Sequence, residues 1–217
     1  MKKIKKLLII ALSVCTILSV TSCATKQKEF RERDETFIAD INLFEIGKLH
    51  LYTNVNFSKP KISDFTVTFA PRTNYVIIKG RIGIDVVRIG FSYPERKSLF
   101  EAKEKYLADY ENGTIPDVKP KKKNAYSTGD VFIEWGVAGA AREADTTYMT
   151  NAQYIEKDKP YFRIFFDSVP DPESKDVYSP RVSIYISPSQ WESIMELCNQ
   201  AHLEELTDEI LAEAEAF

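Results

Sequence analysis

Hydrophobic residues recur at every second position through much of residues 44–93. The clearest example is Phe65, Val67 and Phe69, which alternate with two threonines. Alternate side chains of a β-strand point to the same face, so this spacing predicts strands with one buried face. A change of phase near Val86 indicates a bulge or a break. Further strands are predicted over 44–57, 75–78 and 82–93.

The period of the pattern changes after residue 91. Ser92 and Glu95 are spaced as in a capping box, in which the serine hydroxyl and the glutamate carboxylate each accept a free backbone N–H at the start of a helix. Helical spacing then continues, and Asn112 and Gly113 are typical of a helix end. The hydrophobic positions of this predicted helix are Leu99, Phe100, Tyr106, Leu107 and Tyr110.

The same order of patterns follows a linker at 114–125 that is rich in proline and lysine. Four more strands are predicted, over 131–135, 147–155, 161–166 and 181–186. Ser187 and Gln190 then form a second capping box, with Pro188 near the first helical position, where its missing N–H costs nothing. The apolar face of the second helix consists of Trp191, Ile194, Met195, Cys198 and Ala201.

This repeated order predicts an α+β domain over residues 44–203. It consists of two antiparallel four-stranded β blocks, 44–113 and 125–203, each followed by one helix. If the halves are duplicates, their helices are equivalent and cover one sheet each. The covering residues are then Leu99, Tyr106 and Tyr110 in one half, and Trp191, Ile194 and Cys198 in the other. Residues 204–217 are expected to form an acidic helix or tail.

The tandem order of four strands and one helix resembles the Whirly and PUR-type folds. The run Ser187-Pro-Ser-Gln-Trp191 after a strand looks like the coactivator PC4, which binds single-stranded DNA. The resemblance implies a Whirly/PUR-like pseudo-repeat over 44–203. Proteins of these families bind single-stranded nucleic acid through aromatic and basic residues on the sheet faces. We carry over the fold and not the function, because function depends on the site rather than on the fold.

The amino terminus has the three parts of an export signal. Four lysines lie within the first six residues, and an apolar run follows over 7–20. The run is shorter than the roughly 20 residues that cross a membrane as a helix. The stretch from Val20 to Cys23 resembles the bacterial lipobox, which implies cleavage before Cys23 and diacylglycerol on its sulfur. Residues 1–22 are therefore predicted to be a lipoprotein signal peptide, and residues 23–43 a lipidated tether.

Charge and cysteine content narrow the expected partners. The chain has 29 Lys and Arg against 32 Asp and Glu, and residues 1–22 contain four lysines and no acid, so the mature chain has a net charge of −7. An acidic chain argues against a nucleic-acid partner, because that affinity comes mostly from Lys and Arg. Only Cys198 follows Cys23, so the mature domain is expected to fold without an intramolecular disulfide.

No residue pattern in the chain predicts an active site or a metal site. His50 and His202 are isolated, and Cys198 falls on the apolar helix face, where a thiol is usually a small core residue. The nucleophile-elbow, zinc-protease and phosphate-loop motifs are absent from the sequence. Four acids lie in one loop without the spacing of a calcium-binding loop: Asp167, Asp171, Glu173 and Asp176. Catalytic, cofactor-binding and metal-binding residues are therefore predicted as none, and lipidation is predicted at Cys23.

The leading hypothesis is a non-enzymatic lipoprotein of the bacterial cell envelope that faces away from the cytoplasm. Its membrane contact is the lipid on Cys23, and its partner is another protein, an envelope component or a second copy of the chain. The first alternative is an envelope hydrolase whose carboxylates meet only in space. The second is single-stranded nucleic-acid binding through the Whirly-like fold. The basic run at 119–123 is expected to be a solvated linker, with contact to anionic lipid headgroups as its alternative.

Overall fold

The structure is a computed structural model that describes residues 35–56, 58–116, 118, 120–137, 140–156 and 159–215. The chain consists of two compact units, residues 1–33 and 34–217, and the described residues all belong to the second unit. The predicted signal peptide at 1–22 and the predicted lipidation site Cys23 lie outside the described residues.

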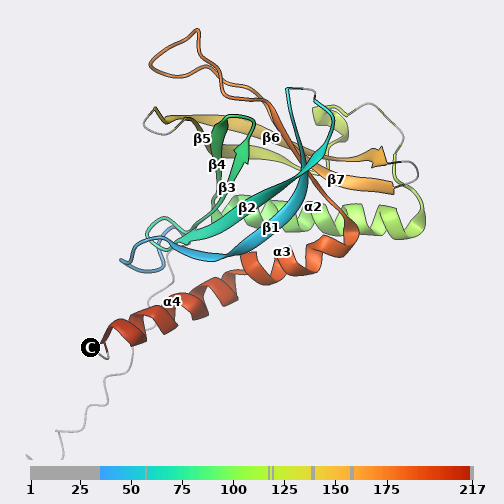
Figure 1. The fold of residues 1–217 in the computed structure, drawn as a ribbon. Helices are drawn as coiled ribbons and strands as arrows, with labels where there is room; N and C mark the ends of the chain where they lie inside the picture. The colour runs from blue at the N-terminus through green and yellow to red at the C-terminus, as the bar shows by residue number, and fades with distance from the viewer. Residues whose placement is uncertain are drawn as a thin grey trace, which may run out of the picture. The chain divides into compact units, whose positions relative to one another are not determined.

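Eight antiparallel strands form a closed barrel in which each strand pairs with the next along the chain, and the last pairs with the first (Figure 1). Alternation of buried and exposed residues runs through most of them, as period two requires. The strands are β1 (Phe44–Val55), β2 (Lys61–Ala70), β3 (Tyr75–Ile82), β4 (Asp85–Phe91), β5 (Thr128–Gly136), β6 (Arg142–Glu156), β7 (Lys159–Phe166) and β8 (Val182–Ile186).

The predicted fold class is wrong, because the strands do not form two separate four-stranded blocks. β4 pairs with β5 from Val86↔Gly136 to Gly90↔Phe132, and β8 pairs with β1 through Tyr52↔Tyr185. Separate blocks would leave unpaired strand edges, whose N–H and C=O groups are satisfied by closing the barrel. The Whirly/PUR-like pseudo-repeat and the resemblance to PC4 fall with the two-block arrangement.

Helices cover one side of the barrel, as Figure 1 shows. α2 (Tyr93–Asn112) follows β4 and contacts β5, β6 and β7, while α3 (Trp191–Cys198) contacts β1. Short helical turns η1 (Lys122–Asn124) and η2 (Pro188–Gln190) precede β5 and α3, and α4 (Gln200–Glu215) ends the described chain. Among the described residues, no helix has the length and hydropathy needed to cross a membrane.

The helix caps form largely where the sequence places them. The Ser92 hydroxyl accepts the Glu95 N–H at 3.4 Å, and Gly113 ends α2 with a positive φ of 66°. At the second box, the Gln190 side-chain oxygen accepts the Ser187 N–H at 2.9 Å. These contacts replace backbone partners that the first and last turns of a helix lack.

One hydrophobic core joins the inward face of the barrel to α2 and α3. Trp191, Ile194 and Cys198 are buried in it, as predicted for the second helix. Of the other two residues predicted for that face, Met195 is half-buried, and Ala201 is exposed and belongs to α4. Leu99 and Tyr106 of α2 are buried as well, whereas the prediction is wrong for Tyr110, which is 43% exposed. The core and its partly buried neighbours lie between Ile38 and Leu203, so the barrel unit contains its own core.

Residues 35–43, the described part of the predicted tether, contact the turn between β2 and β3. The Ile38 N–H donates to the Pro71 carbonyl at 2.8 Å, and the Asn74 side chain donates to the Glu35 carbonyl at 2.7 Å. Arg72 forms an ion pair with Asp40 at 2.6 Å. This part of the segment is therefore attached to the barrel.

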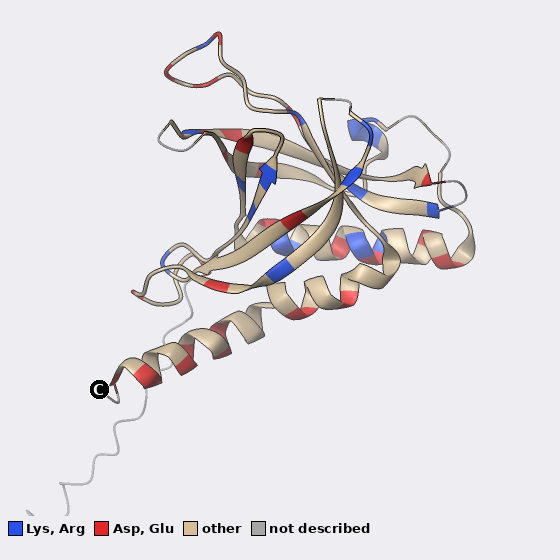
Figure 2. Cartoon of the chain, viewed as in Figure 1, with Lys and Arg blue, Asp and Glu red and all other residues tan. Residues whose placement is uncertain are grey.

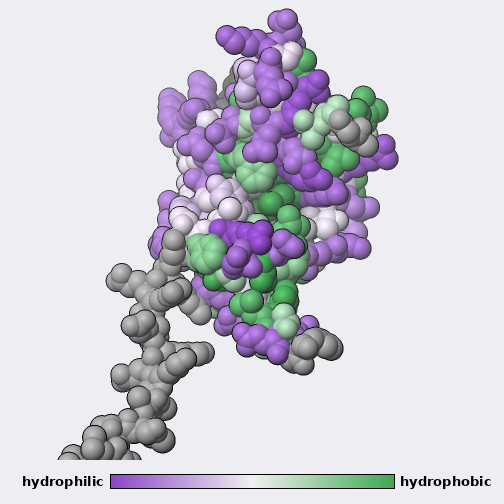
Figure 3. All heavy atoms as spheres, turned by 90° about the vertical axis from the view of Figure 1, so that its left-hand side faces the viewer, coloured by the Kyte–Doolittle hydropathy of each residue, from purple (hydrophilic) through white to green (hydrophobic). Residues whose placement is uncertain are grey.

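The acidic C-terminal stretch is helical and leads away from the barrel. α4 contacts α3, and Figure 2 shows acidic residues but no Lys or Arg along it. Figure 3 looks at the side of the molecule that lies on the left in Figure 1, and it shows hydrophobic patches in the lower half of this face.

Candidate functional site

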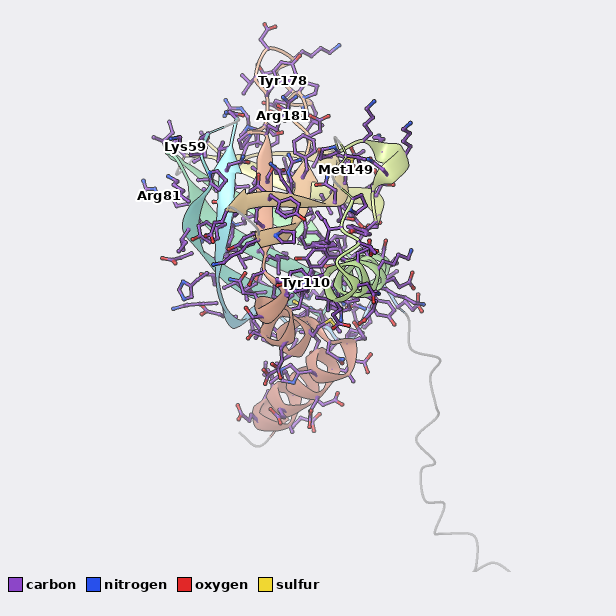
Figure 4. The ribbon with its side chains drawn as sticks, turned by 90° about the vertical axis from the view of Figure 1, so that its right-hand side faces the viewer. Lys59, Arg81, Tyr110, Met149, Tyr178 and Arg181 are labelled. Atoms are coloured by element: carbon purple, nitrogen blue, oxygen red, sulfur yellow. The ribbon has the colours of Figure 1, made fainter. Side chains whose placement is uncertain are left out.

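An open groove of about 750 Å³ lies on the barrel face that points away from the core. Its floor comes from β1, β6, β7 and β8, and one wall comes from the segment after α2. Figure 4 looks at this side and shows Met149, a floor residue, beside that segment. The wall residues are Pro116, Val118 and Pro120, and the principal floor residues are Asn54, Met149, Gln153, Arg163, Phe165 and Tyr185. We call this hollow the outer groove.

Strand register aligns two residues of the groove floor, Arg163 and Tyr185, with Asn151 and Tyr52, which do not line the groove. Arg163 of β7 lies opposite Asn151 of β6 and Tyr185 of β8, and Tyr185 lies opposite Tyr52 of β1. Residues directly opposite each other on neighbouring strands point to the same face of a sheet. An amide, a guanidinium and two phenols therefore cross four strands side by side.

Arg163 is the cation of this row. Its Nε donates to the Ser183 hydroxyl at 3.0 Å, and its guanidinium carbon lies 4.5 Å from the centroid of the Phe165 ring. Burial lowers the pKa of Arg163, an effect that Tyr185 partly offsets, and the group remains protonated as arginine does in proteins. Within the described part of the chain, Arg163 forms no ion pair, so its charge is available to a ligand.

Asn151 is the second unusual group of the row. It is 5% exposed, and neither atom of its side-chain amide has a hydrogen-bond partner among the described residues. A buried polar group without a partner costs about 1–3 kcal/mol. Asn151 does not line the groove, and neither amide atom reaches its surface.

The histidines and acidic loop singled out in the sequence do not come together. His50 Nδ1 lies 2.6 Å from Asp64 on the exposed face of β1 and β2, and His202 lies on α4. Asp167 pairs with Arg181 at 3.1 Å, and Asp171 pairs with Arg142 at 3.0 Å. Within the described ranges, no three His, Cys, Asp or Glu residues are placed to hold a metal ion.

Cys198 is buried at the end of α3, and burial raises the pKa of its thiol to about 12. A neutral thiol in the core is a poor nucleophile, because reactivity belongs to the thiolate. Cys23 lies outside the described residues, so its lipidation stays a prediction.

Sequence reasoning missed the outer groove. Its residues come from four strands and a loop, and only their register places them together. One signal was available, because Arg163 interrupts the hydrophobic β7 run Tyr161–Phe166 with a charge. A charge in a hydrophobic strand indicates a functional or specially paired residue, but it does not predict which residues of the neighbouring strands lie beside it.

Comparison with known proteins gives a family and no assigned activity. A protein of Treponema pallidum (strain Nichols), described as an uncharacterized protein, is 31% identical over 175 residues. The match covers 80% of this chain and 63% of the relative, so the chain spans less than two thirds of that protein's length. No solved structure matches the chain. The family model described as "Uncharacterised Treponema protein" matches residues 26–205, and the chain belongs to that family.

Proposed function

We propose that this protein is a lipid-anchored lipoprotein of the bacterial cell envelope, and that its barrel is a non-enzymatic binding module. The anchor is supported by the export signal and by the lipobox resemblance that ends at Cys23. The binding role is supported by the outer groove, whose volume of about 750 Å³ lies within the roughly 300–1,000 Å³ usual for ligand sites.

The observation that carries the binding role is Arg163 on the groove floor. A guanidinium that is stacked on Phe165 and forms no ion pair with the described residues suits an anionic group. The aromatic and methionine side chains around it suit an apolar part of the same ligand. We therefore assign the groove to an anionic component of the envelope.

Basic residues continue beyond the groove wall. Lys121, Lys122 and Lys123 directly follow Pro120, and Figure 2 shows the basic residues of this turn. The described residues that line the groove include no carboxylate. The groove is thus a basic region of an acidic chain, which favours negative ligands and gives no support to a carboxylate-based hydrolase at this place.

Photo-crosslinking in the intact envelope tests this function on the full lipidated chain. A photoreactive side chain replaces Tyr154, which is 49% exposed at the groove, and in a separate protein it replaces Ile62, which is 61% exposed on β2. We expect an adduct of defined mass from position 154 and not from position 62. Arg163→Gln should reduce its yield several-fold, whereas Arg81→Gln, a matched change outside the groove, should not.

Two outcomes would contradict the assignment. One is equal adduct formation at positions 154 and 62, which indicates random collision. The other is an adduct at position 154 that Arg163→Gln leaves unchanged, because the ligand would then not use the guanidinium.

A further inference from the structure

Three large hydrophobic side chains are exposed on the side of the molecule that carries the outer groove. Val118, in the segment after α2, is 55% exposed, Tyr154 of β6 is 49% exposed, and both line the groove. Tyr110, in the last turn of α2, is 43% exposed. Exposed hydrophobic side chains that gather on one side of a molecule mark a surface for a partner or a membrane.

A chain of contacts connects Tyr110 to this side. Tyr154 lies opposite Pro160 of β7, and the Pro160 carbonyl accepts the hydroxyl of Tyr106 at 2.9 Å. The Tyr106 ring contacts the Tyr110 ring, with centroids 6.2 Å apart. Figure 4 looks at this side and shows both Tyr110 and the groove residue Met149. The end of α2 and the groove therefore belong to one face of the protein.

Three exposed lysines follow the groove wall in an ordered turn, Lys121–Lys123. The Asn124 side-chain oxygen accepts the Lys121 N–H at 2.6 Å, and the Asn124 N–H donates to the Lys121 carbonyl at 3.0 Å. The Tyr126 N–H donates to the Thr150 carbonyl at 3.0 Å, which attaches the end of this segment to β6. The lysines are therefore held beside the barrel at a defined place.

The carboxylates of the neighbouring elements balance these lysines only in part. Within the described chain, none of the three lysines forms an ion pair. Glu156 of β6 pairs with Lys159 at 3.3 Å, and Asp109 of α2 accepts hydrogen bonds from two hydroxyl groups at 2.9 and 3.0 Å. Glu111, in the last turn of α2, is exposed. Positive charge therefore predominates on this side of an acidic chain.

We propose that this side docks on the surface of an anionic phospholipid bilayer, an inference that rests on the binding function proposed for the groove. The docking face consists of Tyr110, Val118, Lys121–Lys123 and Tyr154. Lysines are attracted to the negative surface of such a bilayer, and tyrosines are favoured at its interface with water. The phosphate of one lipid headgroup pairs with Arg163 on the groove floor, so that the anionic ligand of the groove is a phospholipid.

The mixture of apolar and basic side chains favours a bilayer over a soluble anion. A soluble anion would pair with Arg163 but would leave Val118 and Tyr110 in contact with water. A bilayer offers hydrocarbon to these side chains and negative headgroups to the lysines at the same time. The apolar groove wall, which includes Pro116 and Pro120, suits the glycerol and the first methylene groups of the bound lipid.

Flotation of residues 24–217 with lipid vesicles tests the docking without the lipid on Cys23, which would attach the chain to any vesicle. These residues contain the complete core of the barrel. Vesicles of phosphatidylcholine with roughly one third phosphatidylglycerol should bind the protein saturably, and at least tenfold more tightly than vesicles of phosphatidylcholine alone. Equal affinity for the two vesicles, or no binding to either, would overturn the proposal.

Two triple variants separate the docking face from the overall charge of the chain. Replacement of Lys121–Lys123 by glutamine should weaken binding to the anionic vesicles at least tenfold. Lys61→Gln, Lys79→Gln and Arg81→Gln together remove as many charges from exposed positions of β2 and β3, and should weaken binding less than twofold. Equal losses in the two triple variants would contradict a docking face, because net charge alone would then control binding.

The double variant Val118→Ser and Tyr154→Ser tests the apolar part of the docking face. Both positions are exposed, so the core stays intact. Binding to the anionic vesicles should weaken several-fold, and the difference should persist at high salt, which screens the lysines. Unchanged binding would mean that no side chain of the groove edge enters the bilayer, which contradicts the proposal.

The crosslink from position 154 distinguishes a failure of this inference from a failure of the groove assignment. An adduct with the mass of a phospholipid that Arg163→Gln removes supports both. An Arg163-dependent adduct with a protein or with another envelope molecule overturns the lipid docking and leaves the groove assignment intact. An adduct that does not depend on Arg163 contradicts the groove assignment together with the headgroup placed there.

Discussion

At the scale of single residues, the aromatic contacts of Trp191 connect the last part of the chain to the barrel. Its ring meets Phe162 of β7 edge to face, with centroids 5.1 Å apart, and it is 3% exposed. Phe162 in turn contacts Tyr106 of α2 at 5.4 Å. The two helices and β7 therefore share one aromatic cluster.

Trp191→Ala should consequently destabilise the domain by about 3–5 kcal/mol, the usual cost of truncating a buried aromatic residue. Urea unfolding measures the change. Ser187→Ala, directly before η2, is the control substitution, and it should cost only about 1 kcal/mol, since it removes a hydroxyl that donates to the Gln190 side chain at 3.1 Å. Similar losses from both substitutions would show that Trp191 does not hold the core together.

Cys23→Ala tests the anchor independently of the barrel. The thioether on this cysteine is the proposed attachment point for diacylglycerol, so the variant should remain uncleaved or become soluble. Partition between detergent and aqueous phases, together with the mass of the product, gives the answer. A variant of mature mass that still enters the detergent phase would refute the lipid anchor.

The buried thiol and phenols predict an alkaline loss of stability. Burial raises the pKa of Cys198 to about 12 and raises the pKa values of Tyr106 and Tyr148 as well. These groups stay protonated in the folded protein above the pH at which they ionise in the unfolded chain, near 8.5 for Cys and 10 for Tyr. The free energy of unfolding should therefore fall as the pH rises above about 8.5, through Cys198, and fall further above about 10, where the phenols contribute.

Urea midpoints across this pH range measure the effect, and Cys198→Ala should make the fall shallower. Cys198 should also resist iodoacetamide at pH 8 until urea is added. Reaction of the native protein at the rate of a free thiol would contradict the burial of this side chain.

At the scale of elements, sequence periodicity was informative about strands and helices but not about their pairing. The alternation of Phe65, Val67 and Phe69 lies within β2, and the capping residues Ser92 and Ser187 lie where helical structure begins. The phase change near Val86 corresponds to a hairpin at Gly83 and Ile84, since Ile82 pairs with Asp85. Local patterns report local geometry, whereas the pairing of β4 with β5 spans a helix and a loop.

The exposure of Tyr110 shows a second limit of periodicity. Helical spacing places it one turn after Tyr106, and the two rings do contact each other at 6.2 Å. α2 ends at Asn112, and Tyr106 is the last of its buried residues. Tyr110 therefore lies in the last turn, beyond the part of the helix that packs on the barrel. The length of the covering surface is a tertiary property that a helical pattern does not contain.

The seam between β4 and β5 is the element-scale feature that the two-block prediction lacked. Gly90 lies opposite Phe132, and a Cβ atom at this position would collide with the Phe132 ring. The Phe132 ring of β5 thus packs over Gly90 of β4, in the strand pair that connects the first four strands to the last four. An ion pair between Arg88 and Glu134 lies on the same pair of strands.

Gly90→Val should therefore destabilise the domain by about 1–3 kcal/mol or more, as overpacking does. Phe132→Ala in the same chain should restore part of that loss, because it removes the ring that the valine meets. Thermal unfolding of the two single variants and the double variant measures the coupling. Strictly additive losses would show that the ring and the glycine do not contact each other.

At the scale of the whole molecule, the described barrel depends on packing and strand pairing. Its described cysteine, Cys198, is unpaired, and no cluster of metal ligands occurs in the described residues. A chelator or a reductant should accordingly leave the melting temperature of residues 24–217 unchanged within about one degree, since a structural metal or disulfide contributes several kcal/mol. A clear fall with either reagent would reveal a site in the remaining residues.

The outer groove is also a property of the whole molecule, because it needs four strands in register and the segment after α2. The sequence revealed the hydrophobic face of α3 but not that Arg96, on α2, would be buried. The groove exists only after the barrel has closed.

Closure also has a consequence for the order of folding. Most strands pair with a neighbour in the sequence, but β1 must wait for β8, and their ladder runs only from Tyr52↔Tyr185 to Val55↔Val182. The ladder between β1 and β2 is far longer, from Phe44↔Phe69 to Thr53↔Lys61. Joining distant segments is slow, because a long loop must close first. The β1–β8 junction should thus form last during refolding and open first in the native protein, and its amide protons should exchange with solvent before those of β2.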